Sequence, residues 1–237
     1  MIKWKVVPLC ERQLRDVTPS DILNNGLYRR CNVYKSGGGY DLFPRIVEKF
    51  LGRSLSNQFV VQLYGCNLNC PYCYVTRDGV FGRYVEIPTT KLIEDFVASD
   101  QEVFHLMGGA PALYLNSWVD ILQNLPKDRV FTSDLMLSEG EYSMETLVEL
   151  AKYQDAIFAV NIKGLSGEEY LSNTGTTMDE ELIITNLNKV KSSGIKFYVT
   201  FTNCTKELIP RFIEDNKLQG IEYFSIDLID YEALREI

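Results

Sequence analysis

Histidine is almost absent from this 237-residue sequence, in which His105 is the single example. A structural zinc site needs four closed ligands, commonly paired C-x2-C knuckles or sets of cysteine and histidine. Cys70 and Cys73 form one C-x2-C pair, and the sequence has no second pair to complete such a site. A structural zinc site is therefore disfavoured, and His105, in the middle of a predicted strand, is interpreted as a core histidine.

The sequence also lacks a basic stripe, a long apolar run and internal repeats. Its net charge is −8, which argues against a duplex or tRNA substrate held through phosphate contacts, so no nucleic-acid partner is predicted. No apolar run reaches membrane-spanning length, and the start MIKWKVV has no signal-peptide core. We expect no membrane association and a cytoplasmic location, where reducing conditions preserve cysteine thiolates.

Half of the six cysteines fall in one stretch, VVQLYGCNLNCPYCYV at residues 60–75. Cys66, Cys70 and Cys73 give a C-x3-C-x2-C pattern directly after a β-branched run that is typical of a strand. Three thiolates on one short loop can hold a metal ion or an iron–sulfur cluster. Three buried free thiols are the simplest alternative, but the clustering argues against it. A cluster with three protein ligands would leave one iron open for a small molecule.

The remaining cysteines are scattered along the chain. Cys10, Cys31 and Cys204 contain no C-x2-C pair, so a second cluster is not expected. Cys204 follows a predicted strand, where its thiol is either a hydrogen-atom donor, and so a candidate catalytic group, or a buried side chain. Burial is the preferred interpretation, because cysteine behaves as a small apolar residue.

Strands and helices alternate from Gln58 onward. Apolar runs predict strands at residues 59–63, 103–107, 129–133, 156–162, 196–202 and 221–228. Intervening helices are expected to begin at caps formed by Thr90, Asn116, Ser143 and a capping box of Thr177 and Glu180. The predicted fold class is α/β with a mostly parallel open sheet. Six units cannot close an eight-stranded barrel, so we expect a partial (β/α)6 barrel with its site at the carboxyl ends of the strands.

Residues 1–57 are predicted to form an N-terminal extension or cap, and residues 58–237 the partial-barrel core. The extension should contain short strands at residues 3–8 and 31–34 and a helix that is capped by Asp41 and ends at Gly52. Residues 36–39 (SGGG) are interpreted as a flexible turn, because no strand-to-helix context with a Walker lysine follows them.

Small and polar residues follow the predicted strands, at the edge where a site is expected. Successive strands lead to the three cysteines, Gly108 and Gly109, residues 132–134, Asn161 and Lys163, Cys204, and Asp227. Two adjacent glycines allow a backbone to approach a ligand closely.

The cysteine pattern, with Tyr72 before the last cysteine and GGAP at residues 108–111, resembles the signature of the radical S-adenosylmethionine (radical SAM) superfamily. The resemblance implies that Cys66, Cys70 and Cys73 bind a [4Fe–4S] cluster and that the backbone of the glycine turn binds the amino group of S-adenosylmethionine. The usual turn of the family is Gly-Gly-Glu-Pro, and Ala110 replaces its acid. Backbone contacts survive this change, but any role of the acidic side chain is lost.

The later strands look like those of the activating enzymes of glycyl-radical enzymes, such as pyruvate formate-lyase activating enzyme. Their Asp-Thr-Asn-Gly and Asp-Leu-Lys segments align with residues 131–134 and 161–163, where Thr132 and Lys163 are kept. Phe131 and Asn161 replace two aspartates that help to hold a monovalent cation, so no such cation is predicted. The resemblance implies cofactor contacts from Tyr72, Gly108, Gly109, Ala110, Thr132, Ser133, Asn161 and Lys163, with Lys163 neutralising the cofactor carboxylate.

For the reaction, the resemblance implies reductive cleavage of S-adenosylmethionine and hydrogen-atom abstraction from a substrate by a 5′-deoxyadenosyl radical. A flavodoxin- or ferredoxin-type protein would donate the electron. The preferred substrate is a protein or peptide, since little sequence follows the last predicted strand to roof the barrel mouth. One alternative is rearrangement or dehydration of a small molecule beneath residues 1–57. The other is a non-catalytic iron–sulfur electron-transfer or scaffold protein, for which the glycine turn and Lys163 would be unnecessary.

Overall fold

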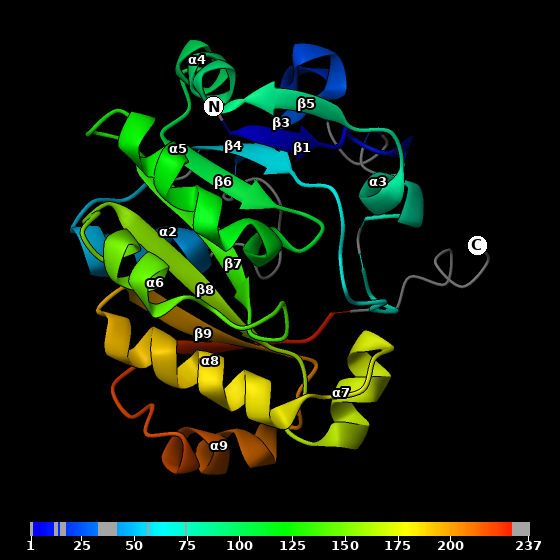
Figure 1. Ribbon diagram of the computed structural model, residues 1–237, viewed down its shortest axis with the longest axis vertical. Coiled ribbons are helices and arrows are strands. Elements are labelled where there is room, and N and C mark those ends of the chain that lie inside the picture. Colours follow the sequence, from blue (N-terminus) through cyan, green and yellow to red (C-terminus); the bar gives the residue numbers. More distant parts are fainter. Residues whose placement is uncertain are drawn as a thin grey trace.

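The computed structural model describes residues 2–11, 14, 18–32, 42–55, 57–73 and 75–228 of the chain. The turn expected at residues 36–39 and the cap expected at Asp41 lie outside these residues. Within them, the expected α/β fold is confirmed: helices flank one curved, mostly parallel sheet that does not close into a barrel (Figure 1).

The central sheet has eight strands in the order β10-β9-β8-β7-β6-β4-β3-β2. Six strands pair in parallel, as expected: β4 (Asn57–Gln62), β6 (Val103–Met107), β7 (Val130–Met136), β8 (Ala156–Ile162), β9 (Lys196–Thr202) and β10 (Tyr223–Ile226). The strands β3 (Tyr28–Asn32) and β2 (Ile22–Leu23) extend the β4 edge in antiparallel pairing. The N-terminal segment therefore adds to the same sheet, and its assignment as a separate cap stays a prediction.

The α-helices in the described part of the chain are α2 (Leu42–Leu51), α3 (Arg77–Phe81), α4 (Thr89–Ala98), α5 (Trp118–Asn124), α6 (Met144–Leu150), α7 (Gly167–Thr174), α8 (Glu180–Ser193) and α9 (Ile209–Asp215). Short 3-10 helices lie at η1 (Pro19–Asp21), η2 (Asn24–Gly26), η3 (Pro111–Ser117) and η4 (Lys206–Leu208). None of the described helices is long and apolar enough to cross a membrane.

The two faces of the sheet bury different kinds of residue, because successive side chains of a strand point to opposite sides. One face packs against α4, α5, α6, α8 and α9 through an aromatic core that includes Phe104, Phe131 and Phe158. We call the other face the inner face. At its amino end, Ile46 and Val47 of α2 pack against the starts of the strands. The carboxyl end of the inner face is left to polar residues, which positions them for a site.

A second, two-stranded sheet lies beside the main one. The strand β1 (Lys3–Val6) pairs in antiparallel fashion with β5 (Val85–Pro88), and Val7 N donates to Gln62 O over 2.9 Å, which joins β1 to the end of β4. The sequence predicts β1 but not β5 or α3. Trp4 is fully buried and donates from Nε1 to Thr89 Oγ1 over 2.9 Å, which fixes this sheet against α4.

Some predicted boundaries are wrong. The strand expected at residues 31–34 is β3, which begins three residues earlier, at Tyr28. The strand expected at residues 129–133 continues to Met136 because residues 134–136 keep pairing with β8. Residues 132–134 therefore lie inside β7 and not at its end.

Three predicted helix caps are also wrong, whereas Ser143 caps α6 as expected. The N-cap of α4 is Pro88, so Thr90 lies inside the helix. Before α5, the chain forms η3, and Asn116 accepts instead from Thr146 Oγ1 over 2.8 Å. Asp179 caps α8 by accepting from Leu182 N over 3.0 Å, so the capping box of residues 177 and 180 does not form.

The turn between β7 and α6 depends on Asn186 of α8, which is fully buried. Its Nδ2 donates to Leu137 O and Gly140 O, each over 2.7 Å, and its Oδ1 accepts from Tyr142 N over 2.8 Å. We expect Asn186→Ala to lower the free energy of unfolding by roughly 2–4 kcal/mol, because three buried partners lose their hydrogen bonds. Urea denaturation measures this effect. Asn188→Ala, on the exposed side of the same helix, is the control, and equal stability of the two variants would contradict the assignment.

Candidate functional site

The three cysteines lie on the loop that follows β4, which we call the cysteine loop (residues 64–73). Cys66, Cys70 and Cys73 line one open cavity of about 660 Å3 together with Gly109. Arg77, Val80 and Phe81, all on α3, and Thr176 complete other parts of its wall. The cavity lies at the carboxyl ends of the parallel strands, on the side of Figure 1 where α3 and α7 are drawn.

Two hydrogen bonds fix the far end of the cysteine loop. Asn69 N donates to Thr174 O at the end of α7 over 2.7 Å, and Cys73 N donates to Cys70 O over 3.0 Å. The helix α7 was not predicted from the sequence. It is capped by Ser166, whose side chain accepts from Glu169 N, and ends at Gly175 in the left-handed conformation. The far end of the cysteine loop is thus attached to the end of α7 by a backbone contact.

The turn at residues 108–111, the glycine turn, packs directly against the cysteine loop. Ala110 N donates to Gly65 O over 2.7 Å. Gly109 has φ of +61°, and a Cβ there would collide with Leu63 O and lie 2.5 Å from Gly65 O. A side chain at position 109 would therefore displace the cysteine loop itself, which gives Gly109 a packing role besides the expected cofactor contact.

Tyr72 and Lys163 meet above the carboxyl end of β8. Lys163 Nζ donates to the Tyr72 hydroxyl over 3.2 Å and lies 5.0 Å from the centre of its ring. Burial raises the pKa of Tyr72, and the neighbouring thiols of Cys70, Cys204 and Cys73 raise it further. The structure thus brings Lys163 close to the cysteine loop, as the sequence predicts.

Cys204 is buried, with 5% of its surface exposed. Its Sγ lies 3.5 Å from Ile162 O and 3.6 Å from Thr202 O. Burial raises the pKa of this thiol to about 12. These contacts agree with the interpretation of Cys204 as a buried side chain.

A set of polar side chains lies on the inner face of the sheet, on β7, β8 and β9. Thr200 Oγ1 donates to Asn161 Oδ1, and Asn161 in turn lies against Asp134. Burial raises the pKa of Asp134, while the hydrogen bond with Asn161 and the charge of Lys163 lower it. Asn161 therefore lies at the mouth, as expected, beside Asp134, which belongs to the aligned segment but is not among the cofactor contacts that the resemblance implies.

The predicted residues of β7 divide between the two faces. Thr132 is buried and paired with His105 of β6, on the inner face. Ser133 is fully buried, and its hydroxyl donates to Leu106 O over 3.2 Å, so its side chain lies on the helix-covered face. Its backbone pairs with Leu106 of β6 and Phe158 of β8, so the structure does not place Ser133 at the predicted cofactor site.

His105 is half-buried on the inner face and contacts Gln58. Its Nδ1 is 2.6 Å from Gln58 Oε1, an acceptor, so the neutral tautomer with a proton on Nδ1 fits this contact. Arg29 of β3 lies nearby, with Nη2 4.0 Å from Met107 Sδ. Sequence analysis missed Arg29 and Glu139, a buried acid in the turn after β7. Alternation along β3 is the signal that could have revealed Arg29.

The residues around the cavity fit an iron–sulfur cluster. The three thiols share one cavity, and Leu68 N donates to Cys66 Sγ over 3.4 Å, a contact that favours a thiolate. In the protein alone, burial raises the pKa of the Cys66 thiol to about 12, and iron would provide the positive charge that offsets this. Among the described residues, no three His, Cys, Asp or Glu side chains could hold a single metal ion. In an iron–sulfur cluster each thiolate binds a different iron, so the three sulfur atoms do not have to converge on a single metal ion.

The fold and the site together define a class: a partial-barrel α/β protein with a three-cysteine loop at the carboxyl ends of its strands. The model of the radical SAM superfamily matches residues 60–214. The chain belongs to the radical SAM superfamily, whose members are enzymes that use a [4Fe–4S] cluster and S-adenosylmethionine.

One curated relative is 7-carboxy-7-deazaguanine synthase of Methanothermobacter thermautotrophicus. It is 28% identical to this chain over 147 residues, which are 60% of this chain and 59% of the relative. The match thus spans less than two thirds of the relative's length. The narrower resemblance to activating enzymes of glycyl-radical enzymes is not confirmed by the matches found.

Solved structures share the fold at low identity. Streptococcus suis SuiB, solved with the precursor peptide SuiA, has a TM-score of 0.56 and 14% identity, with coverage of 84% of this chain and 46% of SuiB. The protein anSMEcpe, solved with AdoMet, has a TM-score of 0.54 and 13% identity, with coverage of 70% of this chain and 49% of that chain. Both confirm the partial-barrel architecture.

His105 predicts a specific pH dependence of stability. Burial, assisted by Arg29, lowers the pKa of His105 to about 3, whereas in the unfolded chain it keeps the ordinary value of about 6.5. Between these values the unfolded state binds a proton that the native state does not, so the free energy of unfolding falls as the pH is lowered from about 6.5 toward 3.

We therefore expect His105→Gln to flatten this dependence by up to about 1.4 kcal/mol per pH unit. Urea denaturation of both proteins at several pH values between 7 and 5 provides the measurement. An unchanged slope in the variant would show that His105 is protonated similarly in the folded and unfolded states.

Proposed function

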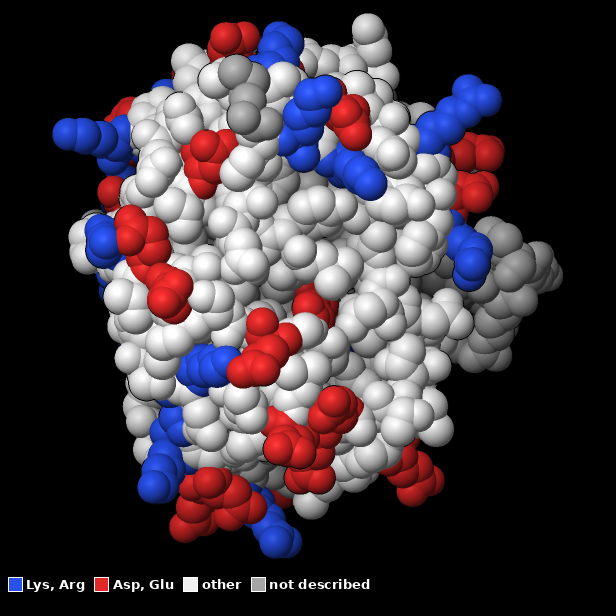
Figure 2. All heavy atoms as spheres, in the orientation of Figure 1, with Lys and Arg blue, Asp and Glu red and all other residues white. Residues whose placement is uncertain are grey.

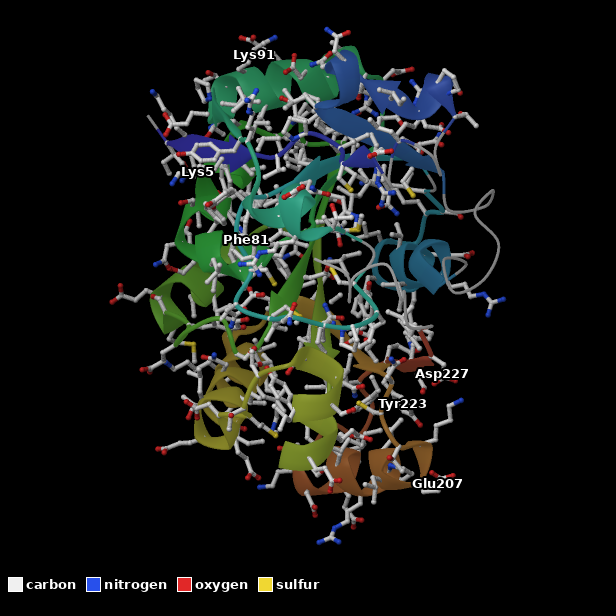
Figure 3. The ribbon with its side chains drawn as sticks, turned by 90° about the vertical axis from the view of Figure 1, so that its right-hand side faces the viewer. Lys5, Phe81, Lys91, Glu207, Tyr223 and Asp227 are labelled. Atoms are coloured by element: carbon white, nitrogen blue, oxygen red, sulfur yellow. The ribbon has the colours of Figure 1, made fainter. Side chains whose placement is uncertain are left out.

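We propose that this radical SAM enzyme abstracts a hydrogen atom from a peptide or protein segment that enters the cavity past α3. The observation that supports this choice is a rim of exposed and half-buried aromatic and basic side chains beside the cysteines, which we call the aromatic rim: Lys5, Tyr64, Arg77, Phe81 and Tyr84. Phe81 and Tyr84 are 44% and 41% exposed. Figure 3 looks at the right-hand side of Figure 1 and shows Phe81 near the middle of this surface, with Lys5 above it.

The aromatic rim is held together by ring and cation–π contacts. Tyr64 and Tyr84 have ring centres 4.9 Å apart, and Lys5 Nζ lies 5.0 Å from the Tyr84 ring. Arg77 Cζ lies 5.5 Å from the Phe81 ring, and both residues line the cavity. Exposed aromatic and arginine side chains are typical of protein-binding surfaces, whereas small ligands are usually enclosed. The aromatic rim therefore favours an extended polypeptide substrate.

Charges elsewhere on the surface are mixed. Figure 2 shows acidic and basic side chains interspersed over the view of Figure 1, with no continuous basic area on that face. The absence of a nucleic-acid partner, the flavodoxin- or ferredoxin-type electron donor and the cytoplasmic location remain predictions.

In this proposal, Cys66, Cys70 and Cys73 hold the cluster, and the backbone of the glycine turn receives the amino group of S-adenosylmethionine. Lys163 lies where it can pair with the carboxylate, and Asn161 and Thr132 contribute polar atoms on the inner face. When bound, the cluster and S-adenosylmethionine supply a one-electron reductive cleavage that yields a hydrogen-abstracting 5′-deoxyadenosyl radical. The protein orients both partners. No general base among its residues is required for that step.

A small-molecule substrate is the second candidate. It is favoured by the relative 7-carboxy-7-deazaguanine synthase and by the polar inner face, where Arg29, His105 and Asp134 could contact a polar compound. Such a substrate would lie deeper in the partial barrel than the aromatic rim.

The two candidates are separated by fractionating an extract of the source cells. The reconstituted enzyme, with dithionite and S-adenosylmethionine, should release more 5′-deoxyadenosine with a protease-sensitive macromolecular fraction. Phe81→Ser should reduce this stimulation, whereas Val148→Ser, an equally exposed position on α6, should not. Stimulation by a protease-resistant low-mass fraction alone would contradict the peptide proposal and support the second candidate.

Lys163 provides a test of the cofactor site. We expect Lys163→Met to keep its cluster and to lose affinity for S-adenosylmethionine about tenfold or more, because a charge-assisted contact is worth roughly 1.5–3 kcal/mol. Equilibrium dialysis and iron analysis measure the two quantities. Lys196→Met, at the amino end of β9 and so at the opposite edge of the sheet from Lys163, is the control. Parent-like affinity in Lys163→Met would rule out the contact with the carboxylate.

A further inference from the structure

Three successive residues after β8 contact the helix α7. Lys163 O accepts a hydrogen bond from Asn173 Nδ2 over 2.9 Å. Two positions on, Leu165 N donates to Glu169 Oε2 over 2.5 Å. Between them, a Cβ at Gly164 would lie 2.5 Å from a Cα atom of α7, so Gly164 packs directly against the backbone of the helix. The backbone of Lys163 is therefore attached to α7 and moves with it.

The same two side chains of α7 also hold the loop that follows β9. Asn173 Nδ2 donates a second hydrogen bond, to Asn203 O over 3.1 Å. Glu169 Oε1 accepts from Thr205 N over 2.6 Å and from Thr205 Oγ1 over 2.7 Å. One amide and one carboxylate thus join the loops at the carboxyl ends of two neighbouring strands, β8 and β9.

The carboxyl end of α7 contacts the cysteine loop. Thr174, the residue after Asn173, accepts at its carbonyl from Asn69 N over 2.7 Å. Gly175 packs so closely that a Cβ there would lie 3.0 Å from Asn69 O. Figure 1 shows α7 at the carboxyl ends of the strands, near the cysteine loop. Adjacent residues of one helix therefore hold the backbone of Lys163 and the backbone of the cysteine loop.

The side chain of Lys163 reaches the same loop by a second route. Its Nζ donates to the Tyr72 hydroxyl and lies above the Tyr72 ring. A lysine side chain has a flexible four-carbon stem, so the position of its backbone limits where the ammonium group can lie. A carboxylate that pairs with Lys163 and also reaches an iron on the cysteine loop requires a fixed separation between the two.

We propose that α7 sets the separation between Lys163 and the cysteine loop, and that Asn173 is the positioning residue through which it acts. The inference rests on the proposed pairing of Lys163 with the cofactor carboxylate. Asn173 acts indirectly, because the N–H groups of its amide go to two backbone carbonyls, Lys163 O and Asn203 O.

This role predicts a loss of affinity that depends on the lysine. In cluster-loaded protein, Asn173→Ala should bind S-adenosylmethionine about three- to tenfold more weakly, as expected when the effect of about one hydrogen bond is lost. Asn173→Leu, which fills a similar space without a donor, should lose as much. In the Lys163→Met background, Asn173→Ala should cause little further loss, because the charge that Asn173 positions is already gone.

The experiment is equilibrium dialysis of S-adenosylmethionine with the parent, each single variant and the double variant, with iron content and thermal stability measured on every sample. A second readout is the electron paramagnetic resonance signal of the reduced cluster. In Asn173→Ala its response to S-adenosylmethionine should need a three- to tenfold higher concentration, at parental iron content. Ser172→Ala, at the exposed neighbouring position of α7, is the control and should match the parent.

Parent-like affinity in both Asn173 variants would overturn the inference. An equal loss in the parent and Lys163→Met backgrounds would also overturn it, since α7 would then support the fold and not the lysine. Loss of iron from both Asn173 variants would do the same, because the helix would then support the cysteine loop alone. Parent-like affinity in Lys163→Met would instead refute the proposed pairing with the carboxylate, so the two failures are distinguishable.

Discussion

The site depends on one backbone contact, the packing of the glycine turn against the base of the cysteine loop. Ala110 N donates to Gly65 O, and Gly109 approaches Leu63 O and Gly65 O so closely that no side chain fits between them. Parallel strands bring these loops to one edge of the sheet, and this contact fixes their relative position. Any change at Gly109 would therefore move the three cysteines as well as the turn.

The residues that pack on the two faces of the sheet explain the position of the site. Large aromatic side chains fill the helix-covered face, and α2 closes the amino end of the inner face. The carboxyl end of the inner face carries polar groups such as Asp134, Asn161 and Thr200. Burying such groups is costly unless they are paired or bind a ligand, so their concentration beside the cysteine loop favours a binding role.

Much of this arrangement could be predicted from the sequence, because it depends on local patterns. The strands β6, β8 and β9 have the predicted bounds, since each is a short apolar run between clear breakers. The end of β7 could not be predicted, because its pairing with β8 overrides local preference. Three predicted helix caps are also wrong, and for α8 the side chain of Asp179 forms the cap instead of Thr177.

We propose that Cys66, Cys70 and Cys73 hold a cluster with one iron left open to S-adenosylmethionine. The most direct measurement is electron paramagnetic resonance of the anaerobically reconstituted, dithionite-reduced protein, with and without S-adenosylmethionine, alongside iron analysis. The claim predicts about four irons per chain, a signal that changes when S-adenosylmethionine is added, and loss of both in Cys66→Ala but not in Cys31→Ala. A full iron content in a variant lacking all three cysteines, or a signal indifferent to S-adenosylmethionine, would contradict it.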